Sequence, residues 1–320
     1  MKKLFIPLVL VLVLALSACG GNQANNAENK GNSTEPSAAN AANAANEESG
    51  TFTYQSENGP VEVPKNPQRV VVITRFLTGN VMILGVPLVG VDEMSKENPN
   101  FQDKLKDVEA VTDESLEKII ELNPDLIIGL SDIKNIDKLK KIAPTVTYTY
   151  GKLDYLSQQL EIGKLLNKEK EAQAWVDDFQ ARTKKAGEEI KAKIGENATV
   201  SVIETFNKQL YVYGDNFGRG TEILYQAFGL SMPEKVKEAT QKDGYLALST
   251  EVLKDYLGDY VIFSKNADED SSFQNTETYK NLPAVKNNHV YEADAKSFYF
   301  NDPLSMEYQL DFFIKSFLGK

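Results

Sequence analysis

One long stretch of helical periodicity, residues 169–194, lies between two segments that alternate short apolar runs with polar ones. Gly195 follows as a natural C-terminal cap. At 1.5 Å per residue such a helix spans about 39 Å. We expect it to join two lobes, although a surface helix of the second half alone fits the same pattern. Its apolar residues recur at spacings near three and four and form one stripe: Trp175, Phe179, Ala186, Ile190 and Ile194.

The two flanking segments both have the pattern of α/β layers. In the first, the apolar runs 70–73, 88–91 and 126–128 are separated by helical stretches, which is typical of parallel sheets. In the second, residues 200–203 match the opening strand. A fourteen-residue segment also recurs, with Ser, Glu, Asp and Ile at equal offsets in 115–128 and 249–262. The sequence therefore predicts an α/β protein with two lobes of one topology.

The N-terminal segment has the layout of a secretory signal. Lys2 and Lys3 precede an apolar run, residues 4–16, that is short for a membrane span. The sequence Leu-Ser-Ala-Cys ending at Cys19 matches the lipobox of bacterial lipoproteins, in which the cysteine is diacylated and becomes the first residue. The alternative is an ordinary signal peptide with an incidental cysteine.

Residues 20–50 contain no aromatic residue and no Val, Ile or Leu. Such a segment cannot bury enough apolar area to offset its ordering entropy. We expect a monomer with a disordered tether, organised as follows: signal peptide 1–18, lipidated Cys19 and tether 19–50, N-terminal lobe 51–168, linking helix 169–195, and C-terminal lobe 196–320.

Charge and rare residue types exclude several classes of function. The formal charge is −11, and removal of residues 1–18 with their two lysines makes it −13, so nucleic-acid binding has no electrostatic basis. One cysteine and one histidine exclude internal disulfides, Cys-rich zinc sites and His-cluster metal sites. The histidine, His289, reads as a turn residue entering a strand. Phosphate-binding and nucleophile-elbow motifs are absent. We predict no enzyme, no cofactor and no protein-bound metal.

The strongest local signal lies in residues 209–220. Alternation along the strand places Tyr211 and Tyr213 on one face. A Gly-rich turn then brings Phe217 and Arg219 to the strand-to-helix edge, where α/β proteins bind ligands. The planar guanidinium of Arg219 suits negatively charged oxygens. The alternative is that Arg219 pairs with a carboxylate and that the aromatic residues belong to the core.

Two further aromatic groups and a second arginine extend the candidate site. Tyr299 lies in the aromatic triplet 298–300, and Tyr148 and Tyr150 come late in the first half. Alternation cannot bury every member of such groups, so we expect some of them to line a cavity. Arg75 follows the first strand and occupies the corresponding position of the first lobe; a plain surface position is its alternative.

Several motifs together resemble siderophore-binding lipoproteins of Gram-positive bacteria. They are the lipobox and residues 64–70, 122–127, 213–220 and 284–290, and the likeness covers essentially all of 51–320. The segments 211–220 and 298–303 resemble ferric hydroxamate (ferrichrome-type) binding proteins. This resemblance implies two Rossmann-like lobes with central, mostly parallel sheets joined by a rigid helix, as in class III periplasmic binding proteins. It also implies an ABC-importer lipoprotein that captures ferric hydroxamate siderophores between the lobes and delivers them to the membrane permease.

The resemblance also assigns residues. Because the siderophore supplies all six iron ligands, the protein would offer an arginine for the hydroxamate oxygens and aromatic rings for the organic shell. Phe217 and Tyr299 depart from the tryptophans often found in that family, which affects the preferred siderophore. The ligand-binding residues implied are Arg219, Tyr211, Phe217, Tyr299 and Tyr150, and Arg75 is added from its place in the first lobe.

Glu117 and Glu251 resemble the acids at the lobe tips that dock onto arginines of the permease. Each follows a serine two residues earlier that can cap a helix, so stabilisation of a helix dipole is the alternative. The lipid on Cys19 would hold the protein at the extracellular face of the cell membrane. Other open alternatives are a receptor for another iron chelate (a catecholate or carboxylate siderophore, or haem) and a surface hydrolase or adhesion lipoprotein.

Overall fold

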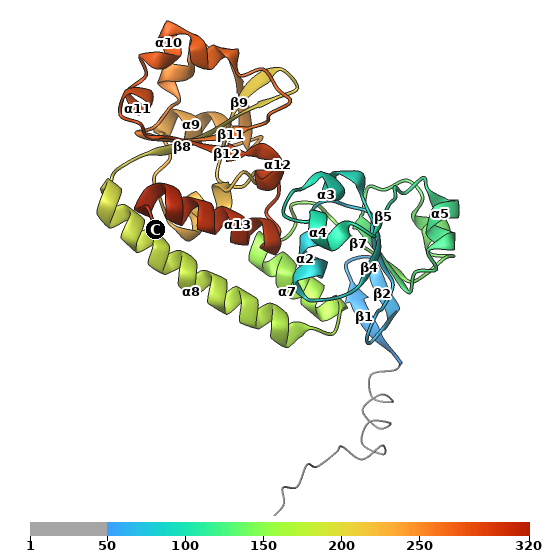
Figure 1. The fold of residues 1–320 in the computed structure, drawn as a ribbon. Helices are drawn as coiled ribbons and strands as arrows, with labels where there is room; N and C mark the ends of the chain where they lie inside the picture. The colour runs from blue at the N-terminus through green and yellow to red at the C-terminus, as the bar shows by residue number, and fades with distance from the viewer. Residues whose placement is uncertain (1–49) are drawn as a thin grey trace, which may run out of the picture. The chain divides into compact units, whose positions relative to one another are not determined.

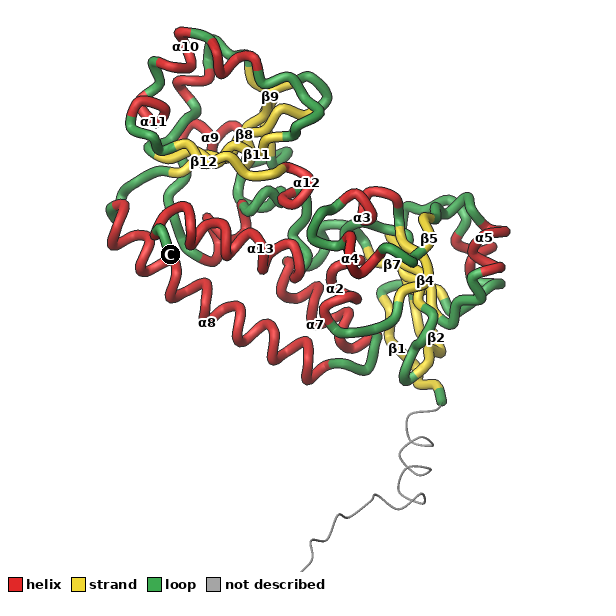
Figure 2. The backbone as a smooth tube through the Cα atoms, viewed as in Figure 1, coloured by secondary structure: helices red, strands yellow, loops and turns green. Residues whose placement is uncertain are grey.

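The computed structural model describes residues 50–320 (Figures 1 and 2). The predicted signal peptide, Cys19 and almost all of the tether lie outside the described residues. Within residues 50–320, no helix has both the length and the apolar character needed to cross a membrane.

The first lobe is built on a five-stranded sheet in which all neighbouring strands are parallel, in the order β5-β4-β3-β6-β7. In β3, Val70 and Val72 pack into one apolar cluster and Val71 into another. Both faces are therefore covered, which explains the continuous apolar run. The strands are β3 (Val70–Val72), β4 (Leu88–Val91), β5 (Glu109–Ala110), β6 (Leu126–Leu130) and β7 (Thr145–Tyr148).

A separate antiparallel hairpin precedes this sheet, formed by β1 (Thr51–Ser56) and β2 (Gly59–Pro64). Its Tyr54 is buried, and the hydroxyl group lies 3.0 Å from that of Tyr148 on β7. The hairpin is thereby tied to the first lobe. The helices of this lobe are α2 (Thr78–Ile83), α3 (Glu93–Glu97), α4 (Gln102–Leu105), α5 (Leu116–Glu121), α6 (Ile136–Leu139) and α7 (Tyr155–Leu165).

The second lobe has a five-stranded sheet with the corresponding order, β10-β9-β8-β11-β12. The strands β8, β11 and β12 are parallel, but β9 and β10 each run antiparallel to their neighbours. The expectation of one topology is thus correct for strand order and wrong for the direction of one strand, β9, since β10 again runs in the direction of β8. The strands are β8 (Val200–Phe206), β9 (Gln209–Tyr213), β10 (Tyr245–Leu248), β11 (Tyr260–Lys265) and β12 (Val290–Asp294).

The reversal has a local cause in the turn between β8 and β9. Asn207 and Lys208 have φ angles of 50° and 63°, the left-handed conformation of a two-residue hairpin turn.

Short helical segments complete this lobe: π-helices η1 (Glu222–Ala227) and η4 (Ile314–Leu318), 3-10 helices η2 (Leu253–Asp255) and η3 (Ser272–Asn275), and α9 (Glu234–Thr240), α10 (Glu277–Lys280), α11 (Pro283–Lys286), α12 (Ala295–Phe298) and α13 (Pro303–Phe313).

The long helix α8 (Glu169–Ile194) runs from the first lobe to the second (Figure 1) and contributes to the cores of both. Ala172 packs into the core of the first lobe, whereas Phe179 and Ile190 pack into that of the second. The predicted helical connection is confirmed, and its interpretation as a surface helix of the second half alone is wrong. Trp175 of α8 also donates from Nε1 to Glu307 of α13, at 2.8 Å.

A second contact joins the lobes where α13 begins. Asp302 is fully buried against α2, so close to Gly79 that a Cβ there would lie 1.6 Å from Asp302 Oδ1. Beside it, Asn98 donates from Nδ2 to Ser305 Oγ at 3.3 Å. Leu304 packs against an apolar cluster of the first lobe. The two lobes are therefore held together by α8 and by the start of α13.

Candidate functional site

A cavity of about 950 Å³ is lined by residues of both lobes. The first lobe contributes part of α2 and the segment 148–155. The second lobe contributes the loop 215–217 after β9, most of α9 and the segment 241–244. Phe217 and Tyr150 are the predicted ligand-binding residues that line it directly.

Arg219 occupies a strained turn at the edge of this region. It has a φ of 58° between Gly218 at 67° and Gly220 at 80°. A left-handed residue other than glycine costs about 1–2 kcal/mol, so the surroundings must impose it. They do so through the amide of Arg219, which donates to Phe298 O at 2.7 Å, and through Gly220, where a Cβ would lie 2.4 Å from Phe313 Cζ.

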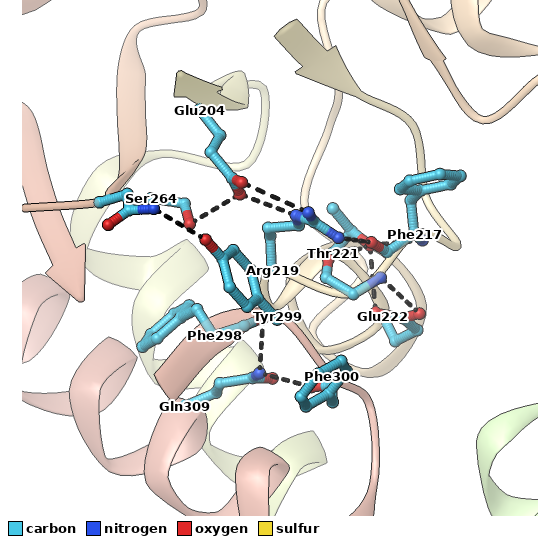
Figure 3. A network of polar contacts seen from close by, with 12 residues as sticks. Glu204, Phe217, Arg219, Thr221, Glu222, Ser264, Phe298, Tyr299, Phe300 and Gln309 are labelled. Atoms are coloured by element: carbon cyan, nitrogen blue, oxygen red, sulfur yellow. Dashed lines mark hydrogen bonds and ion pairs between the residues drawn. The ribbon is translucent and has the colours of Figure 1, made fainter. Parts of the chain in front are cut away.

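The guanidinium of Arg219 is paired with a buried carboxylate (Figure 3). Its Nε and Nη2 donate to Glu204 Oε2 and Oε1 at 2.8 and 3.3 Å, and Nη1 donates to Phe217 O at 3.3 Å. Ser264 also donates to Glu204, at 3.0 Å. Burial lowers the pKa of Arg219, but the attraction of Glu204 outweighs it and the pKa is raised overall.

The predicted alternative, pairing of Arg219 with a carboxylate, is therefore part of the structure. This pairing does not use all of the hydrogen-bond donors of the Arg219 side chain. Of the five N–H groups, three have acceptors within residues 50–320, which leaves one N–H on each terminal nitrogen.

Aromatic rings surround the same guanidinium. Its Cζ lies 4.8 Å from the ring centre of Tyr213, 5.1 Å from Tyr299 and 5.8 Å from Phe217, all within the range of cation–π attraction. Tyr211 contacts this group through Tyr213, at a ring-centre distance of 6.3 Å. The structure thus brings together three of the candidate residues, Arg219, Phe217 and Tyr299, and it adds Tyr213.

The aromatic candidate of the first lobe lies across the cavity. Tyr150 is 59% exposed, and its ring centre is 4.5 Å from that of Phe76. Phe76 in turn lies 5.9 Å from Phe300 of the second lobe. An aromatic contact therefore crosses between the lobes beside the cavity.

Arg75 lies next to this contact without lining the cavity. Its Cζ is 4.9 Å from the ring centre of Phe76. Partial burial and the charge of Glu222 raise the pKa of Tyr150, while Arg219 and Arg75 act to lower it. Positive charges from both lobes therefore act on one tyrosine hydroxyl.

Two buried acids of the site were not predicted. Glu204 lies within β8, an otherwise uncharged and almost fully buried strand, and an acid in such a strand needs a cation partner. Glu222 accepts from the Gly218 amide at 3.0 Å and from Asn301 Nδ2 at 2.8 Å, and burial raises its pKa. It thus ties the Arg219 turn to the segment that holds Tyr299.

The predicted docking acids lie apart from the cavity, one on each lobe, and both are exposed. Glu117 is in the first turn of α5, but Ser115 makes no capping bond to that helix and instead accepts from the Thr112 amide. Glu251 precedes a 3-10 helix rather than an α-helix, and a hydrogen bond from Ser249 lowers its pKa. The expectation that each acid follows a helix-capping serine is wrong.

His289 stands where a turn enters β12, with its ring stacked on Tyr260 at 4.1 Å. Among residues 50–320 there is no group of three or more His, Cys, Asp or Glu side chains placed to hold a metal ion.

Two lobes joined by a long helix, with a cavity lined from both, define the class of solute-binding proteins. A family model described as periplasmic binding protein matches residues 70–297, and the chain belongs to that family. The predicted fold class is confirmed.

Individual relatives agree with this assignment. The iron(3+)-hydroxamate-binding protein FhuD of Bacillus subtilis (strain 168) is 40% identical over 314 residues, covering 96% of this chain and 95% of the relative. The solved structure of FhuD from S. pseudintermedius has a TM-score of 0.76 at 36% identity, covering 85% of this chain and 99% of that one. FhuD2 from Staphylococcus aureus with bound ferrioxamine B has a TM-score of 0.73 at 37% identity, covering 78% and 99%. The resemblance drawn from the sequence motifs is confirmed.

Proposed function

We propose that this protein is the substrate-binding lipoprotein of an ABC importer and that it captures ferric hydroxamate siderophores in the cleft between its lobes. The observation that carries the proposal is Arg219, held rigidly among three aromatic rings with two N–H groups that have no acceptor within residues 50–320. Free donors of a charged group suit the iron-bound oxygens, and the rings suit the organic shell around them. Iron is the cargo, and the siderophore supplies its ligands.

The charge of the cavity wall favours hydroxamates over the alternative chelates. Its ionisable side chains other than tyrosine are four carboxylates and two lysines, a net formal charge of −2: Asp215, Glu234, Glu238, Asp243, Lys237 and Lys242. Arg219 adds no net charge because Glu204 neutralises it. The iron centre of a ferric trihydroxamate is neutral, whereas that of a ferric triscatecholate is a trianion that this wall would repel.

Binding of ferric complexes by isothermal titration tests the proposal. Wild-type protein should bind ferrichrome or ferrioxamine B and should not bind ferric citrate, a ferric triscatecholate or haem. Tight binding of one of those three instead would favour the alternative receptor, and turnover of an ester or peptide would favour a hydrolase.

The role of Arg219 needs a variant that does not strand a buried charge. The double variant Arg219→Ala/Glu204→Ala removes both partners, and we expect affinity for the ferric hydroxamates to fall at least about 100-fold, since each of the two hydrogen bonds lost contributes about 1.5–3 kcal/mol. Arg69→Ala removes an exposed arginine outside the cavity and should bind like wild type. Unchanged affinity in the folded double variant would refute the assigned role.

The proposal extends to anchoring and delivery. Residues 51–168 and 196–320 act as the lobes and 169–195 as their link, in a monomer held by lipid on Cys19 at the extracellular face of the membrane. Cys19→Ala should release the protein into the medium. Glu117→Lys/Glu251→Lys should abolish siderophore uptake but preserve binding in solution, while Asp103→Lys/Glu277→Lys, at exposed acids elsewhere on the two lobes, should preserve both. Normal uptake by the first pair would exclude docking through these acids.

A further inference from the structure

Tyr245 is a large aromatic residue that is 41% exposed at the start of β10, the edge strand of the second sheet. In the antiparallel register it stands directly opposite Tyr213. Directly paired residues share a face of the sheet, so Tyr245 lies on the same face as Tyr211 and Tyr213. The adjacent Leu246 points the other way and packs against a separate apolar cluster.

Four aromatic rings form a closed cluster on this face. Tyr245 lies 5.7 Å from Tyr211 and 5.1 Å from Phe217, and Tyr213 lies 6.3 Å from Tyr211 and 5.4 Å from Phe217, all measured between ring centres. The chain bends to allow this packing at Gly244, whose φ is 78° and where a Cβ would lie 2.7 Å from Phe217 Cδ2. The exposed ring is therefore supported by the rings behind it.

This cluster is continuous with the cavity and with Arg219. Phe217 lines the cavity, as do Asp243 and Gly244, the two residues before Tyr245. Tyr213 and Phe217 are also the rings that face the guanidinium. Phe217 therefore lies between the guanidinium of Arg219 and the ring of Tyr245, in contact with both.

We propose that Tyr245 is a further ligand-binding residue, which packs against the hydrocarbon arms of a bound ferric hydroxamate outside the iron-bound oxygens. The inference rests on the proposed function and deepens it. A ring already fixed by its neighbours loses little freedom on binding, and an aromatic ring contributes mainly through the apolar area it covers. Tyr245 therefore sets preference among hydroxamates by how much of each organic shell reaches it.

The test compares two tyrosines of nearly equal exposure in the full chain. Tyr308 on α13 is 40% exposed and contacts Phe298, at a ring-centre distance of 5.9 Å. Neither tyrosine lines the cavity itself, but Tyr245 contacts Phe217, which does. Tyr245→Ala should weaken ferrioxamine B and ferrichrome binding about tenfold, and by different factors for the two ligands. Tyr308→Ala should bind both like wild type.

Two further variants separate contact from support of Phe217. Tyr245→Phe keeps the ring and should bind like wild type, whereas Tyr245→Leu keeps apolar bulk behind Phe217 and should still lose affinity. Thermal unfolding of each variant shows that it is folded. If Tyr245→Ala and Tyr245→Leu bind both ligands as well as Tyr308→Ala does, the inference is overturned while the proposed function stands. If wild-type protein binds no ferric hydroxamate, both are overturned.

Discussion

The two lobes share an order of strands but present side chains to the cavity in different ways. In the first lobe all neighbouring strands are parallel, and residues reach the cavity from α2 and from segments at strand ends, such as the one that carries Tyr150. In the second lobe the turn at Asn207 and Lys208 reverses the chain, so a strand itself supplies Tyr211 and Tyr213 beside the Arg219 turn. Reversing one strand, β9, thus places a pair of aromatic side chains beside Arg219.

The difference extends to how firmly each side is held. Arg219 is fixed by a buried carboxylate, a backbone hydrogen bond and the two glycines beside it. Tyr150, by contrast, is mostly exposed and is supported by Phe76 alone among the aromatic rings of residues 50–320. The second lobe therefore holds the more preorganised half of the site.

The largest expected effect comes from removing the carboxylate behind Arg219. Glu204→Ala leaves a buried guanidinium unpaired and should lower the free energy of unfolding by about 3–5 kcal/mol. The matched change in the first lobe is Glu57→Ala, which breaks an ion pair with Lys152 whose lysine side chain is 55% exposed and should cost less than about 1 kcal/mol. Urea unfolding followed by circular dichroism measures both. Equal losses would contradict the difference in preorganisation.

A smaller loss of stability is expected from adding a Cβ at two glycines that have a left-handed backbone conformation. Gly220→Ala in the second lobe combines an unfavourable φ of 80° with a clash against the fully buried Phe313 and should cost about 3 kcal/mol. Gly85 in the first lobe has a φ of 72° and open space around it, so Gly85→Ala should cost about 1 kcal/mol. The same unfolding measurement applies to both variants. If Gly220→Ala costs no more stability than Gly85→Ala, the Arg219 turn is easily deformed.

The smallest effect concerns the acid of the second lobe that is buried against the first. Burial raises the pKa of Asp302 from 3.8 to about 6, although hydrogen bonds from Ser305 and Leu304 act to lower it. Below about pH 4 both states are protonated, and as the pH rises to about 6 the unfolded chain ionises first, so the contribution of Asp302 to stability falls by about 2–3 kcal/mol. Asp302→Asn should remove this part of the pH dependence of unfolding. The same pH slope in both proteins would refute the shift.

Local periodicity was sufficient to predict the strands β3, β4, β6 and β8 and the long helix, because each depends on apolar spacing within a few residues. It could not predict that Arg219 meets Glu204 fifteen residues away, since that contact depends on the strand direction imposed by the β8–β9 turn. The place of Tyr245 could not be predicted for the same reason, because it depends on the register that pairs Tyr245 with Tyr213. The motif around Arg219 could be recognised from the sequence because its glycines and aromatic residues are close together in the chain.

Trp175 is the only tryptophan in the sequence, and it stands on the helix that links the lobes rather than at the cavity. Its ring stacks on Phe179 at 4.8 Å, and its Nε1 is bonded to Glu307 of α13. The intrinsic fluorescence of Trp175 therefore reports how α8 and α13 pack against each other. A ferric complex quenches such emission by energy transfer, but a gallium complex of the same siderophore does not absorb there. Fluorescence with the gallium complex would thus isolate any movement of the linking helix from the filling of the cleft.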